Sequence, residues 1–478
     1  MVKQYLFGIV TCFVSTTLLA AAPPATGFRA GAATSDITPS LGSPIVGNFL
    51  AFPATNVHDE LHARCLVLDD GHTKLALVVL DLLLLDRKLD LNARKLIEQE
   101  VGIPTQDVLI SAVHTHSATL AGNGRFPFTP QINDYPGFFV RRIVDGVKCA
   151  AKRLRPAQLA FTTVQAPEHV FNRRWFLKPG SMPPNPFGGI DQVKMNPPPG
   201  SPNLVQPAGP TDPTVSILAL REPDGRPIAV FSAYSLHYVG GVAHGDISAD
   251  YYGMYCGRLE RLMHGDEQDP PMVAMMANGT SGDVNNTNFL HPRPPKKLYE
   301  QMRFVADDLA AKVHTALAKV EYQNRVTLAV RYREPMIRRH LPTTEQTGWA
   351  KQRLAQPAPK PGETDLPYIY ARRTVGMIGG EASVAVPLQV LRIGPVCIGT
   401  MPNEPFAEIG LEFRKRSPVQ PAFLVELAHG SFGYLPTARH YELGGYETWL
   451  GSSAFEPHAS EKMLDTLLEM VAEVREAK

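Results

Sequence analysis

The sequence predicts a mixed α/β fold, in which a large central β-sheet structure is flanked by helices and the functional site lies at the carboxyl ends of strands. Runs rich in Val, Ile and Leu, which are typical of buried strands, alternate with amphipathic helical patterns. The clearest case is a run at residues 75–85, a helical pattern at 87–102 and a second run at 107–116. This succession indicates two parallel strands joined by a crossover helix.

Further strands and helices continue the pattern to the end of the chain. The expected strands are residues 228–237, 271–278, 388–400 and 422–428, and the expected helices are residues 249–264, 298–320 and 461–478. Two stretches crowded with Pro, residues 177–213 and 354–367, are predicted to be loops. The first is long for a loop within a compact domain, which is typical of a lid or rim over a site.

Residues 1–22 have the pattern of a secretory signal peptide, so the protein is expected to be exported to a periplasm or secreted. Lys3 precedes a short apolar stretch that ends in the small residues Ala20, Ala21 and Ala22. A single membrane anchor is the rival interpretation, but the stretch is short for the roughly 20 residues that span a bilayer.

Composition and charge favour a small-molecule partner. The chain has 478 residues, of which 44% are hydrophobic and 19% charged, and its net charge is +1. No long block of like charge points to nucleic acid. Because no Cys-x-x-Cys pair is present, a metal would have to be held by His, carboxylate or another oxygen ligand.

Polar residues follow several of the predicted strands. His114 and His116 end one strand, His237 ends another, and Glu404 and Tyr434 follow two more. Ligand sites in such sheets form beyond the carboxyl ends of the strands, so these side chains are expected at one edge. Two His, a Glu and a Tyr offer nitrogen and oxygen ligands that a catalytic zinc ion accepts.

Each of these residues, taken alone, also fits a structural role. The two histidines of a His-x-His sequence can point to opposite faces of a strand, and His237 can be a hydrogen-bonded core histidine. Glu404 can be a helix-start carboxylate, because a helical pattern follows it, and a buried tyrosine such as Tyr434 usually packs. The residue pattern by itself therefore leaves both interpretations open.

In their order along the chain, these segments resemble the catalytic domain of the neutral, non-lysosomal ceramidases. ISAVHTHSA is similar to the family's zinc-binding THTHS segment, SLHYVGG to the segment with the next zinc histidine, and MPNEPFAEIG to its Pro-x-Glu-Phe-Thr stretch. GYLPTARHYELGGYET is similar to the family's GYVTTxxEYxxQxYEG segment, with its two tyrosines at the same spacing. The resemblance implies that residues 28–478 form a ceramidase-like catalytic domain.

The resemblance also implies a role for each matched residue. Zinc would be held by His114, His237, Glu404 and Tyr434, while His116, Tyr446 and Arg173 would act in catalysis. Zinc-bound water, whose pKa falls toward about 7, would attack the acyl carbon. Arg173 and Tyr446 would stabilise the oxyanion, and His116 would shuttle the proton, although a structural role for His116 is an equal alternative. Asp250 and Asp283 are expected to cap loops or to support the metal ligands, in preference to acting as catalytic acids.

Two departures from the family's pattern bear on the substrate. A glycine, Gly279, stands where the family's Ser-Asn-x-Gly-Asp-Val segment has its serine, so Thr280 or Ser281 is the candidate replacement in substrate binding. Only one helical pattern follows the tyrosine segment, so the chain is expected to lack the family's C-terminal immunoglobulin-like domain.

The expected function is a zinc-dependent hydrolase that cleaves an N-acyl amide bond, in a small-molecule or lipid substrate with an acyl group. Peripheral contact with a membrane is compatible with such a substrate. The alternatives are an esterase or amidase acting on a polar, non-lipid acyl group, and a non-catalytic binding protein of the same fold.

Overall fold

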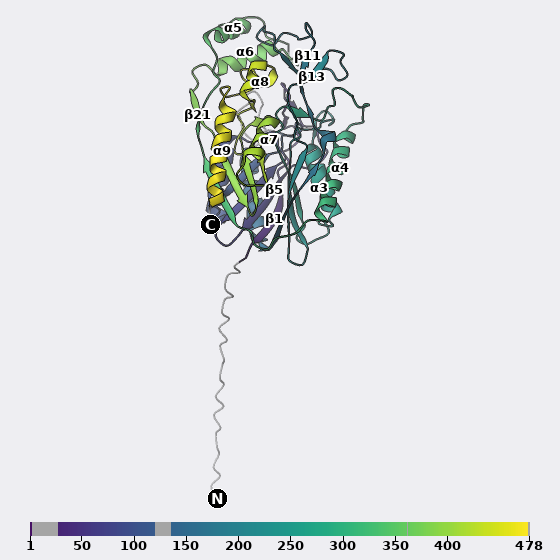
Figure 1. The fold of residues 1–478 in the computed structure, drawn as a ribbon, viewed down its shortest axis with the longest axis vertical. Helices are drawn as coiled ribbons and strands as arrows, with labels where there is room; N and C mark the ends of the chain where they lie inside the picture. The colour runs from purple at the N-terminus through teal and green to yellow at the C-terminus, as the bar shows by residue number, and fades with distance from the viewer. Residues whose placement is uncertain (2–26, 120–134, 361, 477–478) are drawn as a thin grey trace.

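The computed structural model describes residues 1, 27–119, 135–360 and 362–476 (Figure 1). The predicted signal peptide, residues 1–22, falls outside these ranges apart from its first residue. The prediction of a mixed α/β fold is confirmed, because helices flank a central β structure on both sides (Figure 1). This β structure consists of three larger sheets, of five, four and four strands, with smaller sheets around them.

The first sheet has the strand order β7, β6, β5, β1, β8. Its strands are β1 (Arg29–Asp36), β5 (His62–Asp69), β6 (Lys74–Leu80), β7 (Val108–Ala112) and β8 (Arg155–Pro156). β6 and β7 are parallel, and α1 (Arg87–Val101) connects them, which confirms the predicted crossover. The Asp86 side chain caps the start of α1, and Gly102, with φ 74°, ends it. α2 (Tyr135–Lys152) packs beside α1 on the outer face of the sheet.

The second sheet has the strand order β17, β15, β14, β9. Its strands are β9 (Gln158–Gln165), β14 (Thr214–Arg221), β15 (Pro227–Tyr234) and β17 (Val273–Asn278). β15 and β17 are parallel, and the chain between them forms α3 (Asp250–Leu262). α4 (Glu300–Leu317) packs against α3, and both helices lie along one side of the molecule (Figure 1).

The third sheet has the strand order β19, β22, β23, β25. Its strands are β19 (Leu328–Arg333), β22 (Leu388–Ile393), β23 (Val396–Thr400) and β25 (Ala422–Val425). β23 and β25 are parallel, and α7 (Ala407–Arg416) connects them. α9 (Ala459–Glu476) and α7 pack against this sheet, and α9 lies on the opposite side of the molecule from α3 and α4 (Figure 1).

The main core lies where the inner faces of the three sheets meet. Leu77 from the first sheet, Phe231 from the second and Phe423 from the third are each buried in one apolar cluster. The rings of Phe231 and Phe423 lie 6.5 Å apart, centroid to centroid. Burial of apolar surface from three sheets in one cluster stabilises their mutual arrangement and so positions the strand ends.

Hydrogen bonds join the carboxyl ends of the three parallel pairs. The Ala112 N–H donates to the Leu427 carbonyl at 3.1 Å, and the Glu426 N–H donates to the Asn278 carbonyl at 3.1 Å. The Asn278 side-chain amide donates to the Val113 carbonyl at 3.2 Å. β7, β17 and β25 therefore end at one place, and the loops that follow them meet there.

Several shorter elements gather at one end of the molecule, namely α5 (Thr344–Leu354), α6 (Leu366–Gly376), α8 (Ala438–Leu443), β11 (Arg174–Leu177) and β13 (Leu204–Pro207) (Figure 1). The prediction that residues 177–213 form a loop is wrong in part, because β12 (Val193–Met195) and β13 both pair with β11. Their ladder partners lie elsewhere in the chain, so local composition did not indicate these strands. The predicted loop at residues 354–367 is confirmed for its described part between α5 and α6.

The remaining elements have two or three residues each. They are β2 (Pro44–Ile45), β3 (Phe52–Pro53), β4 (Asn56–Val57), β10 (Phe171–Asn172), β16 (Asp246–Ile247), β18 (Val284–Asn285), β20 (Met336–Arg338), β21 (Ser383–Ala385), β24 (Glu404–Pro405), β26 (Tyr434–Leu435) and the 3₁₀ turns η1 (Thr105–Asp107), η2 (Pro167–His169) and η3 (Tyr446–Thr448). No helix within the described ranges is long and apolar enough to span a bilayer. The described cysteines, Cys65, Cys149, Cys256 and Cys397, are free thiols.

Candidate metal centre

His114 follows β7 directly and has a left-handed backbone conformation, with φ 76°. Its ring is buried, and its Nδ1 atom lies 2.9 Å from the Leu83 carbonyl oxygen. Nε2 lies 3.3 Å from Oε2 of Glu404 and 3.2 Å from Nε2 of His116. A left-handed non-glycine residue is uncommon, and here it turns the imidazole away from the strand and toward other donor atoms.

His237 approaches His114 from the end of β15. Its ring centroid lies 4.5 Å from that of His114, and its Nδ1 lies 3.2 Å from both the carbonyl oxygen and Oγ of Ser281. Burial holds the pKa of His237 well below its usual value, and the positive charge of Arg173 adds to the effect. The shift favours the neutral imidazole, which is the form that binds metals.

Glu404 and Tyr434 are neighbours across the parallel pair β24 and β26. Both side chains are buried. Burial raises the pKa of Tyr434 well above its usual value and the Glu404 charge adds to this, while Arg173 acts in the opposite direction. The pair brings a carboxylate and a phenol oxygen to the side of the site that faces His114.

Of the predicted metal ligands, His114 lies beside both His237 and Glu404, and Tyr434 lies next to Glu404 across a strand pair. The candidate ligand atoms of the three histidines, His114, His116 and His237, lie within 4.8 Å of one another. The donor set fits zinc, because it combines imidazole nitrogens with oxygen ligands. The Nδ1 atoms of His114 and His237 each lie within hydrogen-bond distance of an oxygen atom, so the Nε2 atoms are left for a metal.

Arg173 is buried beside this group. Its Nε donates to Oε1 of Glu447 at 3.0 Å, and its Nη2 donates to the Gly282 carbonyl at 2.7 Å. The guanidinium carbon lies 5.3 Å from the centroid of the Tyr434 ring. Arg173 therefore contacts a predicted metal ligand, while its oxyanion-binding role stays a prediction.

His116 and Tyr446 occupy the partly exposed side of the site. The His116 ring stacks on Tyr238, with centroids 3.7 Å apart, and lies against Gly47, where a Cβ atom would come within 2.7 Å of the imidazole. The Tyr446 ring lies 5.6 Å from the Tyr434 ring, centroid to centroid. Both residues are placed where a substrate could reach them.

Thr280 and Ser281, the candidates for substrate binding, are both buried, and of their two hydroxyls that of Ser281 is held by a protein carboxylate. Thr280 packs against Gly410 of α7, where a Cβ atom would meet Oγ1 at 2.3 Å. Ser281 Oγ donates to Oε1 of Glu426 at 2.9 Å and lies beside His237. These contacts favour supporting roles, and a direct contact with substrate stays a prediction.

The glycine at position 279 has a steric reason. A Cβ atom there would lie 2.5 Å from Oγ of Ser235, which in turn accepts a hydrogen bond from the Thr280 N–H at 3.0 Å. The Ser235 hydroxyl therefore occupies the space that a serine side chain at position 279 would need.

Sequence reasoning missed two buried glutamates that support the site. Glu426, at the end of β25, accepts two hydrogen bonds from Ser281, and burial together with the Glu404 charge raises its pKa well above the usual value. Glu447 pairs with both Arg173 and Arg174, which outweigh the effect of burial and lower its pKa. Glu426 could have been found as a carboxylate that ends an apolar strand, whereas no local signal marks Glu447.

Asp283 and Asp250 have the capping roles that the sequence predicts. Asp283 accepts from the Ala407 N–H, at the start of α7, at 2.9 Å. Asp250 accepts from the Val239 and Gly240 N–H groups, at 2.9 and 2.8 Å, and so shapes the loop after His237.

A second group of potential metal ligands, Glu168, His169 and Asp308, already holds a cation. The Lys312 ammonium forms ion pairs with both carboxylates. A metal ion there would have to displace it, so this group is better described as a salt-bridge cluster.

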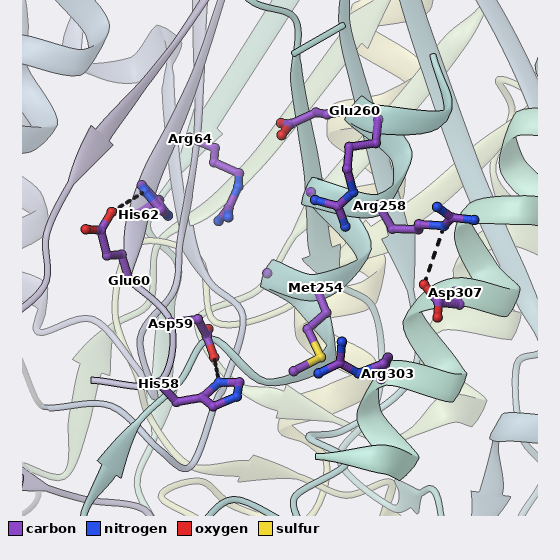
Figure 2. Close-up of a pocket in the computed structure, with 13 residues that line it drawn as sticks. His58, Asp59, Glu60, His62, Arg64, Met254, Arg258, Glu260, Arg303 and Asp307 are labelled. Carbon is purple, nitrogen blue, oxygen red and sulfur yellow. Dashed lines mark hydrogen bonds and ion pairs between the residues drawn. The ribbon is translucent and has the colours of Figure 1, made fainter. Parts of the chain in front are cut away.

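Two cavities lie outside the immediate site. Figure 2 shows one of about 740 Å³, between the start of β5 and the helices α3 and α4. Charges of both signs line it, including the pair Arg258 and Asp307, and none of the predicted site residues does. The other, of about 1260 Å³, is lined by Gly433, next to Tyr434, and by Phe49, whose ring lies 6.1 Å from that of Tyr446.

Fold and site together define a mixed α/β protein with buried His, Glu and Tyr side chains gathered at its strand ends. The family model described as neutral/alkaline non-lysosomal ceramidase, N-terminal, matches residues 28–293. The match covers more than half of the chain, and the chain therefore belongs to the neutral/alkaline non-lysosomal ceramidase family, a family of amide hydrolases.

Two solved structures share the fold. A ceramidase complexed with C2 is 17% identical, with a TM-score of 0.70, and the match covers 94% of this chain and 76% of that chain. The neutral ceramidase from Pseudomonas aeruginosa is 18% identical, also with a TM-score of 0.70, and the match covers 94% of this chain and 75% of that chain.

Proposed function

We propose that this protein is an exported, zinc-dependent hydrolase that cleaves the N-acyl amide bond of ceramide or of a related acyl amide. The observation that carries the proposal is the approach of His114 and His237 to each other beside Glu404, with both Nδ1 atoms held by oxygen atoms. Membership of the ceramidase family supports amide hydrolysis.

The residues that would hold zinc are His114, His237, Glu404 and Tyr434. When bound, zinc supplies a Lewis acid and a water molecule that ionises near neutral pH. Burial lowers the pKa of His237, which favours the neutral imidazole with a lone pair for the metal. Arg173, over the Tyr434 ring, offsets part of the effect that burial has on the phenol.

Three other residues would act on the substrate. His116, with its Nε2 close to that of His114, is placed to move a proton between the attacking water and the leaving amine. The Tyr446 hydroxyl and the Arg173 guanidinium would donate to the oxygen that gains negative charge in the transition state. The cavity next to Tyr446 has the volume and the apolar wall for an alkyl chain.

A second candidate function is hydrolysis of an ester or amide with a polar, non-lipid acyl group. Gly279 favours it, because this chain has no serine where the family's reaction uses one. In that case, the acyl groups that fit the cavity next to Tyr446 would decide which esters and amides are cleaved.

The test is metal analysis of the purified protein together with hydrolysis of an N-acyl sphingosine, a short N-acyl amino acid and a short-chain aryl ester. About one zinc per chain with ceramide cleavage would support the proposal. Zinc with cleavage of only the polar substrates would favour the second candidate. Hydrolysis by a metal-free protein would overturn the mechanism.

Export rests on the predicted signal peptide and is tested separately. Expression of the full chain, followed by fractionation and N-terminal sequencing, should yield a mature protein that begins near residue 23 outside the cytoplasm. A full-length protein retained in the membrane fraction would instead support the anchor.

A further inference from the structure

The cavity of about 1260 Å³ beside Tyr446 combines an apolar wall with an unusual share of positive charge. Its apolar wall includes Phe49, Leu50, Phe52, Leu84, Leu85 and Ile369. Gly433, next to Tyr434, lines the cavity, and the ring of Phe49 lies 6.1 Å from the ring of Tyr446. The cavity therefore lies beside the candidate metal centre.

Arg373 of α6 is a partly buried cation in the wall of this cavity. Its guanidinium carbon lies 5.7 Å from the ring centroid of Phe49 and 5.0 Å from that of Tyr370. Nη1 donates to the Gly451 carbonyl at 3.4 Å, an approach that the missing side chain of Gly451 allows. Among the residues that the structure describes, no carboxylate forms an ion pair with Arg373.

This lack of a carboxylate distinguishes the partly buried Arg373 from the fully buried arginines near the site. Arg173 and Arg174 both pair with Glu447. A guanidinium removed from water is normally paired, because desolvation of an unpaired charge is costly. The aromatic faces stabilise Arg373 in part, and its remaining donors are suited to an anion from outside the protein.

The other charged groups of the cavity add to the positive charge. Arg339 and Lys360 also line it, and within the described chain neither forms an ion pair with a carboxylate. The two acidic residues of the lining are already engaged, since Asp86 caps α1 and Glu363 accepts from the Lys360 N–H at 3.1 Å. The cavity therefore favours a negatively charged group.

We propose that the preferred substrates are acyl amides whose amine portion carries an anionic group, such as N-acyl amino acids or N-acyl sulfonates, and that Arg373 binds this anion. The alkyl chain would lie against the apolar wall. The inference rests on the proposed hydrolase function and deepens it, because a neutral ceramide would offer Arg373 no anionic partner.

The test compares N-lauroylglycine and N-lauroyltaurine with N-lauroylethanolamine, which has the same acyl chain but no charge. Wild-type protein should show a kcat/KM about 10-fold or more higher for the anionic amides, the usual effect of one charge-assisted hydrogen bond. Arg373→Gln should remove most of this preference by raising KM for the anionic amides alone. Arg373→Lys, which keeps the charge, should retain part of it.

The matched control is Arg338→Gln. The Arg338 side chain is 76% exposed, is only one residue from Arg339 and does not line the cavity, so all three amides should be cleaved as by wild type. The inference would be overturned if wild-type protein cleaved charged and neutral amides with equal kcat/KM. It would also be overturned if a folded Arg373→Gln variant lost the same fraction of kcat/KM for both kinds of amide. In either case the hydrolase function would stand. If zinc is bound and no amide is cleaved, the proposed function itself fails.

Discussion

The Nδ1 atom of His237 lies 3.2 Å from both the carbonyl oxygen and the hydroxyl oxygen of Ser281. Ser281 is held in turn by Glu426, which accepts from its hydroxyl at 2.9 Å and from its N–H at 3.1 Å. Since the carboxylate fixes the serine and the serine fixes the imidazole, Nε2 of His237 is held toward His114.

Loss of this support should weaken metal binding. Ser281→Ala and Glu426→Gln should each lower zinc affinity about 10- to 100-fold, because partners of this kind orient a metal-binding histidine. Competition with a chelator of known affinity measures the change. Glu267→Gln, at a side chain that is 74% exposed, is the control. Wild-type affinity in both test variants would mean that His237 is oriented by other contacts.

Removal of a predicted ligand should have a larger effect. His237→Ala and Glu404→Ala should abolish bound zinc and turnover together, because each variant removes one of the donor atoms that would hold the ion. Metal analysis and amide hydrolysis on the same preparations provide the measurement. His264→Ala, at a side chain that is 77% exposed, should retain both properties. Full activity and full zinc content in either ligand variant would rule out this assignment.

The variant Arg173→Ala tests a catalytic role of Arg173 separately from metal binding. If the guanidinium stabilises the oxyanion, kcat/KM should fall by about 10²-fold or more while zinc content is unchanged. Thermal unfolding serves as the check on folding, because the variant also removes the ion pair with Glu447. A folded variant that loses zinc would show instead that Arg173 acts through Tyr434.

Gly279→Ser should destabilise the protein. The new Cβ atom would lie 2.5 Å from Oγ of Ser235, and overpacking of this kind typically costs about 1–3 kcal/mol. The double variant with Ser235→Ala should recover part of the loss, since the Ser235 main chain still lies 3.1 Å from the added atom. Chemical denaturation of both variants tests this, and a Gly279→Ser protein as stable as wild type would contradict the steric explanation.

Asp90 should make stability depend on pH. Burial by itself raises the pKa of Asp90, but His429, Arg94 and Arg87 outweigh it, and the pKa falls below the usual value. A carboxylate with a lowered pKa stabilises the fold above its unfolded-state pKa, near 4, and loses this effect as pH falls through the folded-state value. Asp90→Asn should therefore cost about 3–5 kcal/mol at pH 7 and progressively less at acidic pH.

Denaturation curves between pH 7 and pH 3 measure this difference between wild type and variant. The exposed Asp224→Asn serves as the control, because its removal should leave the pH dependence of wild type in place. A variant that is destabilised equally at all pH values would show that Asp90 contributes by packing and not by charge.

Hydrophobic periodicity predicted the strands and helices well where each buries one face against neighbours in the core. The pair β6 and β7 with α1 between them is one example, because its apolar runs and its caps are local features. The strands β12 and β13 were missed, since they are stabilised by pairing with β11 and not by an apolar pattern of their own.

The candidate site was predictable where its residues lie in motifs at strand ends. His114, His237, Glu404 and Tyr434 belong to this class, and the structure places His114 beside His237 and Glu404, with Tyr434 next to Glu404 across a strand pair. The supporting contacts were not predictable, because their partners are far apart in the chain. Ser281 and Glu426 are 145 residues apart, and Arg173 and Glu447 are 274 residues apart.

By itself, the sequence determined the class of fold, the order of the elements and the residue types that face the strand ends, because each of these is encoded in local patterns of polarity and in short motifs. Only the tertiary structure decided which side chains support the site, and that Arg373 lines a cavity without forming an ion pair with a described carboxylate. Such contacts depend on the packing of three sheets around one core, and packing joins residues that no local pattern relates.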